Sequence, residues 1–196
     1  IFTHHFESHK FIKESIKKSI PPKVIITLPI ELNYKWLGHE LFDLRKFAKE
    51  NNLLILESKN FNELEVQNCL KDFNINLLLI LGCSQIIKKE LIDIPKFGAI
   101  GSHASLLPDL RGPAPVNWAL IKDLKQTGNT LMKLSNILDA GEIIDQTIIR
   151  ITDSDNCETL YQKIAETNSV MILKVLFYIL KNQRLPTSQK QNFINE

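Results

Sequence analysis

Short apolar runs alternate with longer helical patterns along this chain of 196 residues, and this alternation limits the fold more than any other feature. Segment 77–81 is continuously apolar, which is typical of a strand buried on both faces. Strands that alternate with helices predict an α/β fold with a doubly wound, mostly parallel sheet and helices on both faces. We predict strands at 1–2, 23–28, 53–56, 74–81, 99–102, 129–134 and 143–151, and helices at 8–19, 37–50, 62–73, 84–91, 114–122 and 155–181.

The composition fits a single globular domain that covers residues 1–196. Hydrophobic residues make up 44% of the chain and charged residues 23%, which is ordinary for a soluble protein. No apolar run reaches the roughly 18 residues of a membrane helix, so no membrane partner is expected. The isolated cysteines Cys69, Cys83 and Cys157 indicate a reducing, cytoplasmic location rather than a disulfide framework. Because the chain starts at Ile1, we expect residues before it to be missing.

The net charge argues against a nucleic-acid partner, and the residues around the histidines argue against a metal site. A net charge of +2 gives no strong attraction to polyanions, so nucleic-acid contact is not expected. His4, His5 and His9 lie close together in sequence, but no cysteine accompanies them and their spacing matches no common metal site. We therefore expect no metal centre.

Two segments carry the residues suited to proton transfer, namely 101–117 (GSHASLLPDLRGPAPVN) and 138–144 (LDAGEII). His103 follows a predicted strand, and ligands of open α/β sheets collect outside the carboxyl ends of the strands. Imidazole titrates near working pH, and a nearby carboxylate such as Asp139 favours its charged form. The two residues are distant in sequence, so only the fold can bring them together.

Together these segments resemble the N10-formyltetrahydrofolate-dependent formyltransferases, the family of the glycinamide ribonucleotide, methionyl-tRNA and amino-sugar formyltransferases. The resemblance covers about 77–180 and rests on H-x-S-L-L-P followed by R-G, together with D-x-G-x-I-I downstream. It implies a Rossmann-like fold, a formyltransferase activity and N10-formyltetrahydrofolate as the formyl donor. By this resemblance, His103 and Asp139 match the family's catalytic histidine and aspartate.

One position departs from the family's pattern. Gly101 stands where the family usually has an asparagine that donates to the formyl oxygen. The hydroxyl of Ser102 or a backbone N–H group is the candidate replacement, and Ser102 is therefore a candidate catalytic residue. Losing such a donor outright lowers a rate by about 10²–10³. Two alternatives thus stay open: a folate-binding module without turnover, and a hydrolase that deformylates the cofactor with water.

The resemblance also implies residues that bind the cofactor and the substrate. Ser105 belongs to the loop that shapes the site beside the histidine. Arg111 can bind a phosphate or carboxylate of the substrate in a bidentate manner, or form a surface salt bridge. Cys83 is interpreted as a small buried hydrophobic residue rather than a redox group. The slot for the pterin ring of the cofactor is expected to include Leu81, Cys83, Ser84, Gln85, Ile86, Ile87, Asn136 and Ile137.

The acceptor amine is inferred from segment 111–116, RGPAPV, which resembles the methionyl-tRNA and amino-sugar branches. The chain ends at Glu196 and is nearly neutral, and we take both facts as arguments against tRNA, whose phosphates call for basic contacts. Segment 101–118 (GSHASLLP…APVNW) resembles the amino-sugar branch more closely, so we expect a small-molecule acceptor, the amine of a nucleotide-linked amino sugar. A methionyl-tRNA formyltransferase catalytic core is the alternative. The sequence indicates no oligomeric state.

Overall fold

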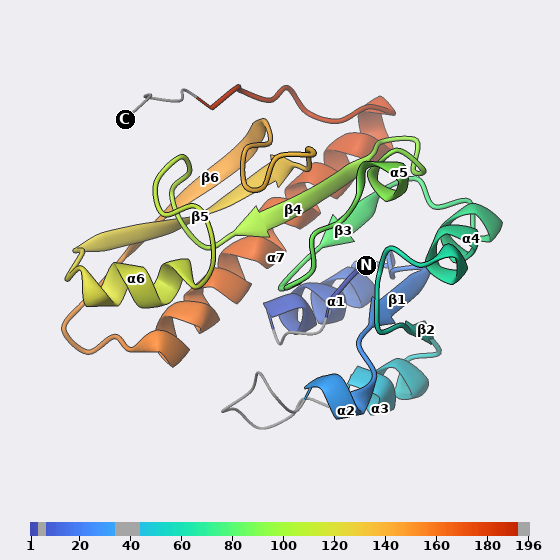
Figure 1. The fold of residues 1–196 in the computed structure, drawn as a ribbon, viewed down its shortest axis with the longest axis horizontal. Helices are drawn as coiled ribbons and strands as arrows, with labels where there is room; N and C mark the ends of the chain where they lie inside the picture. The colour runs from blue at the N-terminus through green and yellow to red at the C-terminus, as the bar shows by residue number, and fades with distance from the viewer. Residues whose placement is uncertain (4–6, 34–43, 192–196) are drawn as a thin grey trace. The chain divides into compact units, whose positions relative to one another are not determined.

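The computed structural model describes residues 1–3, 7–33 and 44–191, and the chain divides into two compact units, Ile1–Ala99 and Ile100–Glu196 (Figure 1). Both units contain strands and helices, so the predicted α/β class is confirmed. The prediction that residues 1–196 form one domain stays a prediction. No helix in the described ranges has the length and apolar character needed to cross a membrane.

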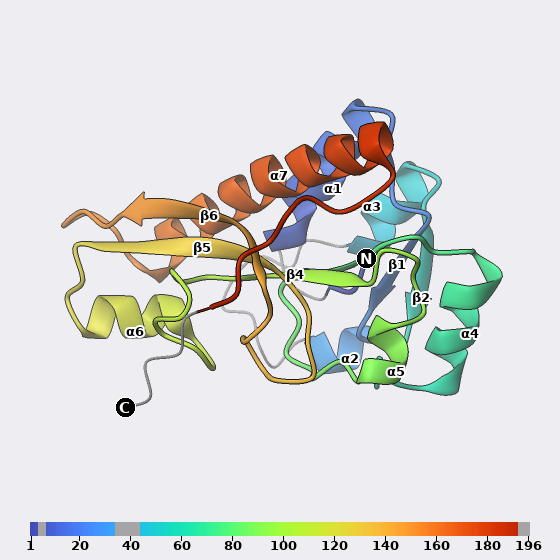
Figure 2. The same ribbon diagram turned by 90° about the horizontal axis from the view of Figure 1, so that it is seen from above.

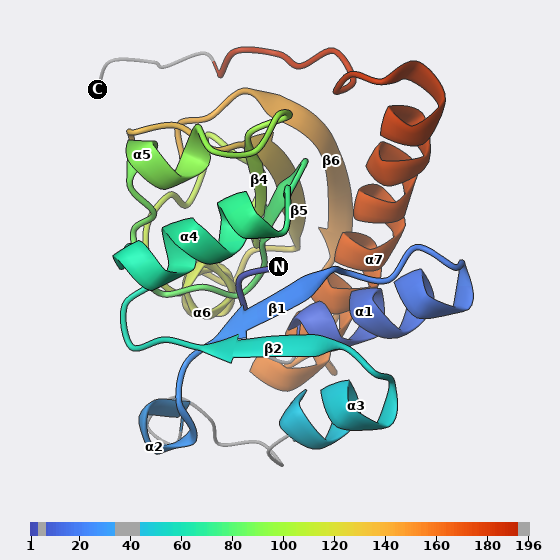
Figure 3. The ribbon, with the colours of Figure 1, turned by 90° about the vertical axis from the view of Figure 1, so that its right-hand side faces the viewer.

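The first unit is built on parallel strands. β1 and β2 run side by side in the same direction, with Val24 opposite Leu54 (Figure 3). Phe2 forms parallel bridges to Ile26 of β1 and to Ile80 of β3, so the start of the chain lies between these two strands. The elements of this unit are α1 (Glu7–Lys17), β1 (Val24–Thr27), α2 (Ile30–Asn33), α3 (Leu44–Glu50), β2 (Leu54–Glu57), α4 (Leu64–Asp72), β3 (Leu78–Ile80) and α5 (Lys89–Ile92).

The helix predicted at 84–91 is wrong for most of its length, because helix forms only from Lys89 onward. The side chain of Gln85 accepts a hydrogen bond from the Phe61 N–H at 2.8 Å and donates one to the Lys59 carbonyl at 2.8 Å. Asn62 similarly donates to the carbonyl of Ile86 at 2.9 Å. These contacts with a distant segment hold 84–88 as a loop against its local helical pattern.

The second unit contains antiparallel strands, a direction that the alternation of elements did not predict. β4 and β5 pair in opposite directions, with His103 opposite Thr130, and β6 continues the antiparallel arrangement beside β5 (Figure 2). The short loop 134–142 joins β5 to β6, and a connection of this kind returns the chain antiparallel. The elements are β4 (Ala99–His103), α6 (Pro115–Ile121), β5 (Gln126–Lys133), β6 (Ile143–Arg150) and α7 (Cys157–Asn182).

Helix α7 holds the strands of the second unit in place. It packs against β5, β6 and α6. Asn156 caps its start by accepting from the Thr159 N–H at 3.0 Å, while Thr159 accepts from the Asn156 N–H in return. The amide of Asn129 on β5 donates to the Asn168 side chain on α7 at 2.7 Å, and both residues are fully buried. This buried pair fixes the helix against the strand that lies opposite His103.

Candidate active site

His103 is the last residue of β4, and only 9% of its surface is exposed. Its Nε2 atom lies 2.8 Å from the carbonyl oxygen of Leu110. Because a carbonyl only accepts, this nitrogen carries a hydrogen. Leu110 has a left-handed backbone with φ of 53°, so an uncommon local conformation accompanies this contact. The imidazole is therefore oriented by its own loop, and Nδ1 is the nitrogen left to face another group.

Asp139 faces that second nitrogen. Its Oδ1 atom lies 3.6 Å from Nδ1 of His103, and its Oδ2 atom accepts a hydrogen bond from the Gly112 N–H at 2.9 Å. When Nδ1 is protonated, the imidazole can direct one hydrogen toward Asp139 and the other toward the Leu110 carbonyl. The fold thus brings together the two residues that the sequence singled out, while their catalytic roles stay predictions.

The loop after His103 is held by the hydroxyl of Thr130 on the neighbouring strand. This hydroxyl donates to the carbonyl of Ser105 at 2.7 Å and accepts from the Leu107 N–H at 3.1 Å. The side-chain amide of Gln146 donates both to the same hydroxyl and to the Leu107 carbonyl, each at 2.8 Å. One fully buried hydroxyl therefore ties the S-L-L-P loop to β5 and β6.

Replacing Thr130 by valine is expected to lower the free energy of unfolding by about 1–3 kcal/mol, because the buried Leu107 N–H loses its partner. Thr127→Val is the matched control, since it makes the same change on the same strand. The Thr127 hydroxyl is buried with no hydrogen-bond partner among the described residues, so its removal should be neutral or stabilising. Denaturant unfolding of both variants measures the difference, and equal losses would contradict the role given to Thr130.

The geometry of β4 argues against a shared role for Ser102 and His103. Side chains alternate between the two faces of a strand, so Gly101 and His103 share one face and Ser102 takes the other. The Ser102 hydroxyl is buried and has no hydrogen-bond partner within the described part of the chain. Ser102 is therefore poorly placed to replace the missing asparagine, and a backbone N–H remains as the candidate donor.

Ser105, predicted to contact substrate, is fully buried. Its hydroxyl donates to the carbonyl of Asp109 at 2.6 Å, and its N–H donates to the carbonyl of His103 at 2.8 Å. Both contacts shape the loop. They support a structural role for Ser105, and substrate contact stays a prediction.

Arg111 and Asp139 are linked by a residue that the sequence reasoning missed. The guanidinium of Arg111 donates to the side-chain oxygen of Gln191. The side-chain nitrogen of Gln191 donates to the carbonyls of Asp139 at 3.0 Å and Gly141 at 2.8 Å. Gln191 is distant in sequence from both segments and follows no motif, so no local pattern could have identified it.

The predicted cofactor residues in the first unit divide into buried and exposed positions. Leu81 and Ile87 are buried in the core, and the amide of Gln85 is occupied by backbone groups. Ser84 is exposed, and Ile86 exposes 70% of its surface. Ser84 and Ile86 are the most exposed residues of this set, and a cofactor role for the whole set stays a prediction.

Cys83 is partly buried, and its interpretation as a small buried hydrophobic residue stays a prediction. Burial raises the pKa of its thiol to about 11, although a backbone hydrogen bond from Gln85 partly opposes the effect. The reactive thiolate is therefore scarce at neutral pH, which argues against nucleophilic or redox chemistry at this position.

The remaining predicted cofactor residues, Asn136 and Ile137, lie in the loop 134–142 that also carries Asp139. Both are exposed, and Ile137 exposes 64% of its surface. The hydroxyl of Ser135 donates to the Ile137 carbonyl at 2.9 Å and accepts from its N–H at 3.3 Å, which gives this stretch a defined turn. The loop therefore presents an apolar side chain to solvent close in sequence to Asp139.

Within the described ranges, no group of three or more His, Cys, Asp or Glu side chains is arranged to hold a metal ion. His4 and His5, which the sequence analysis considered, lie outside those ranges.

Comparison with known proteins decides the family. Residues 13–176 match the formyl transferase family. The chain belongs to this family. The resemblance inferred from the His103 and Asp139 segments is therefore confirmed.

Individual formyl transferases support the same assignment. The chain is 34% identical over 149 residues to the methionyl-tRNA formyltransferase of Clostridium perfringens (strain SM101 / Type A), covering 76% of this chain and 48% of that protein. The crystal structure of phosphoribosylglycinamide formyltransferase from Bacillus halodurans superposes with a TM-score of 0.75 at 20% identity, over 93% of this chain and 95% of that one.

A third relative is a sugar 3N-formyl transferase, WlaRD, crystallised in the presence of dTDP and 5-N-formyl-THF. It superposes with a TM-score of 0.68 at 24% identity, over 95% of this chain and 63% of that one. At these identities the two structural matches establish the Rossmann-like formyl transferase fold. The chain spans about half the length of the curated relatives it matches.

Proposed function

We propose that this chain transfers a formyl group from N10-formyltetrahydrofolate to a primary amine. The observation that carries the proposal is the His103–Asp139 pair, in which each side chain is fixed by a separate backbone contact. In the transfer, the amine nitrogen attacks the formyl carbon and the bond from that carbon to N10 breaks. The attacking amine loses a proton and N10 gains one, so the site has to move one proton.

The two residues suit these steps. The 3.6 Å separation of Nδ1 and Oδ1 is longer than a hydrogen bond, so a proton on Nδ1 is available to the formyl oxygen or to a bridging water. His103 then stabilises the oxyanion of the tetrahedral intermediate, and Asp139 stabilises the charged imidazole and relays the proton. Asn136 and Ile137, exposed in the same loop as Asp139, are proposed to contact the cofactor.

Methionyl-tRNA is the first candidate acceptor, because 34% identity over 149 residues links the chain to a methionyl-tRNA formyltransferase. A nucleotide-linked amino sugar, expected from segment 101–118 and the net charge of +2, is the second. Arg111 is proposed to assist with an anionic group of either acceptor, both of which carry phosphate.

The test follows release of tetrahydrofolate from N10-formyltetrahydrofolate by absorbance. Methionyl-tRNA, a nucleotide-linked amino sugar and glycinamide ribonucleotide are supplied separately, and a fourth reaction receives no acceptor. Turnover with one acceptor alone supports the proposal and identifies the branch. Formate release without any acceptor would instead indicate a hydrolase. Tight folate binding with no turnover in any reaction would indicate a binding module.

The glycine at position 101 leads to a prediction about kcat. Gly101→Asn returns an amide donor to the face of β4 that carries His103, so kcat is expected to rise about tenfold. This gain is smaller than the 10²–10³ that removal of a preorganised donor costs, because the surroundings are not built around this amide. Ser102→Asn, which places the same side chain on the opposite face, is the control and should bring no gain. Equal rates for wild type and Gly101→Asn would show that another group already supplies the donor.

A further inference from the structure

The chain after α7 returns to the loop that carries Asp139. Gln189 pairs with Ile143 at the start of β6, and the two residues exchange backbone hydrogen bonds of 2.7 and 2.8 Å. Figure 2 shows this part of the chain running back from the end of α7 across the beginning of β6. We call residues 188–191 the return segment. It is anchored by main-chain contacts on one side of the Asp139 loop.

A polar cluster strengthens this anchor. The hydroxyl of Ser188 donates to Glu142 at 2.6 Å, and the ammonium group of Lys133 lies 3.0 Å from the same carboxylate oxygen. The hydrogen bond from Ser188, together with Lys133, holds the pKa of Glu142 below its ordinary value. The return segment is therefore tied to Glu142 just before β6, and the same carboxylate pairs with Lys133, the last residue of β5.

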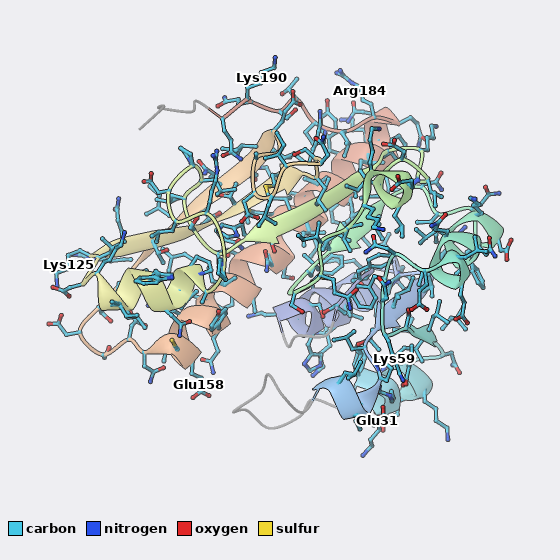
Figure 4. The ribbon with its side chains drawn as sticks, in the orientation of Figure 1. Glu31, Lys59, Lys125, Glu158, Arg184 and Lys190 are labelled. Atoms are coloured by element: carbon cyan, nitrogen blue, oxygen red, sulfur yellow. The ribbon has the colours of Figure 1, made fainter. Side chains whose placement is uncertain are left out.

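Gln191 stands apart from its neighbours in the return segment. Lys190 and Gln189 are exposed, and Figure 4 shows the Lys190 side chain pointing away from the molecule. Gln191 exposes only 6% of its surface, and its amide reaches Arg111 through the oxygen and two carbonyls through the nitrogen. Both hydrogens of the Gln191 amide are donated to carbonyls of loop 134–142, and its oxygen accepts from Arg111, so this buried side chain has a hydrogen-bond partner for each of its polar groups.

The backbone of Asp139 explains why such contacts are needed. Asp139 adopts φ of 51°, in the left-handed region that non-glycine residues seldom occupy. A residue persists in that region only when its surroundings hold it there. Gln191 holds the carbonyls of Asp139 and Gly141, on either side of Ala140. Without these bonds the loop can relax, and the carboxylate can leave both His103 and the Gly112 N–H.

We propose that Gln191 is a positioning residue that keeps the Asp139 carboxylate against His103 and links Arg111 to the same loop. The functional part of this inference rests on the proposed formyl transfer. The positional part does not, because the Gly112 N–H reports directly on where the carboxylate lies.

The test compares Gln191→Leu with Gln189→Leu, a matched control that makes the same change on an exposed neighbour whose pairing with Ile143 is through the backbone. Amide hydrogen exchange of Gly112, measured by NMR on the full chain, is expected to be at least tenfold faster in Gln191→Leu and unchanged in Gln189→Leu. Exchange of Leu131 in β5 should not change, which separates a local movement from global destabilisation. Unchanged Gly112 exchange in Gln191→Leu would overturn the proposal.

Kinetics add a second readout. Gln191→Leu is expected to lower kcat about tenfold with little change in the KM for the formyl donor, and Gln189→Leu should match wild type. Gln191→Glu keeps an acceptor for Arg111 but loses both donations to the loop, so it should be at least as slow as Gln191→Leu. Wild-type rates and Gly112 exchange in Gln191→Glu would overturn the link to Asp139. If wild type itself transfers no formyl group, the proposed function fails while Gly112 exchange still tests the positioning.

Discussion

Replacing His103 by alanine is expected to lower kcat for formyl transfer by about 10²–10⁴, the usual contribution of a positioned proton-transfer group. The variant removes the imidazole that faces Asp139 at 3.6 Å. Folate binding should change much less, because the loss falls on the transition state rather than on the bound ground state. Single-turnover rates and folate affinity, measured on wild type and variant, separate the two effects.

The paired variant Asp139→Ala tests whether the two side chains act as a unit. If they do, kcat of the double variant His103→Ala/Asp139→Ala should be at most a few-fold lower than kcat of the slower single variant. Fully multiplicative losses would show that each residue acts alone and would contradict the proposed relay. Thr127→Val, which alters a buried hydroxyl without a partner in the described residues, controls for mild changes in the core.

Gly141→Ala is expected to produce the largest structural effect of any single-atom addition near the site. A Cβ atom at this position would lie 1.7 Å from the carbonyl oxygen of Lys133, which belongs to the backbone of β5 and cannot rotate away. The loop between β5 and β6 must move to relieve the overlap. We expect a loss of about 3 kcal/mol in the free energy of unfolding, the upper part of the range for overpacking. We also expect formyl transfer to be lost, because Asp139 moves with the loop.

Gly112→Ala provides the comparison for this variant. Its φ of 93° strains any side chain, but a Cβ there would meet no atom within 4 Å. The destabilisation should therefore be smaller, about 1 kcal/mol, and reflect backbone strain alone. Thermal unfolding of both variants gives the measurement. A Gly141→Ala protein as stable as wild type would mean that the β5–β6 loop adapts freely, and the account of this glycine would be wrong.

Several features could be read from the sequence because they depend on short-range patterns. Apolar runs and helical periodicity predicted the α/β class and placed most of the helices and strands. The motifs around His103 and Asp139 identified the family, which the comparison confirms. The reason for the glycine in the D-x-G motif came from the structure, where only a residue without a side chain fits at Gly141 against the Lys133 carbonyl.

Other features depended on contacts between distant segments, which no local pattern encodes. The antiparallel direction of β4 and β5 and the loop at 84–88 follow from pairing and hydrogen bonds with residues far along the chain. The face on which Ser102 lies could be assigned only once β4 was defined. The roles given to Thr130 and Gln191 arise from buried hydrogen bonds that form when β5 and the return segment meet the site. The sequence thus determined that His103 and Asp139 could perform the chemistry. The tertiary structure decided that Thr130 and Gln191 position the loops that carry them. The reason is that a buried polar group forms hydrogen bonds with the groups that the fold places next to it, which can be distant in sequence.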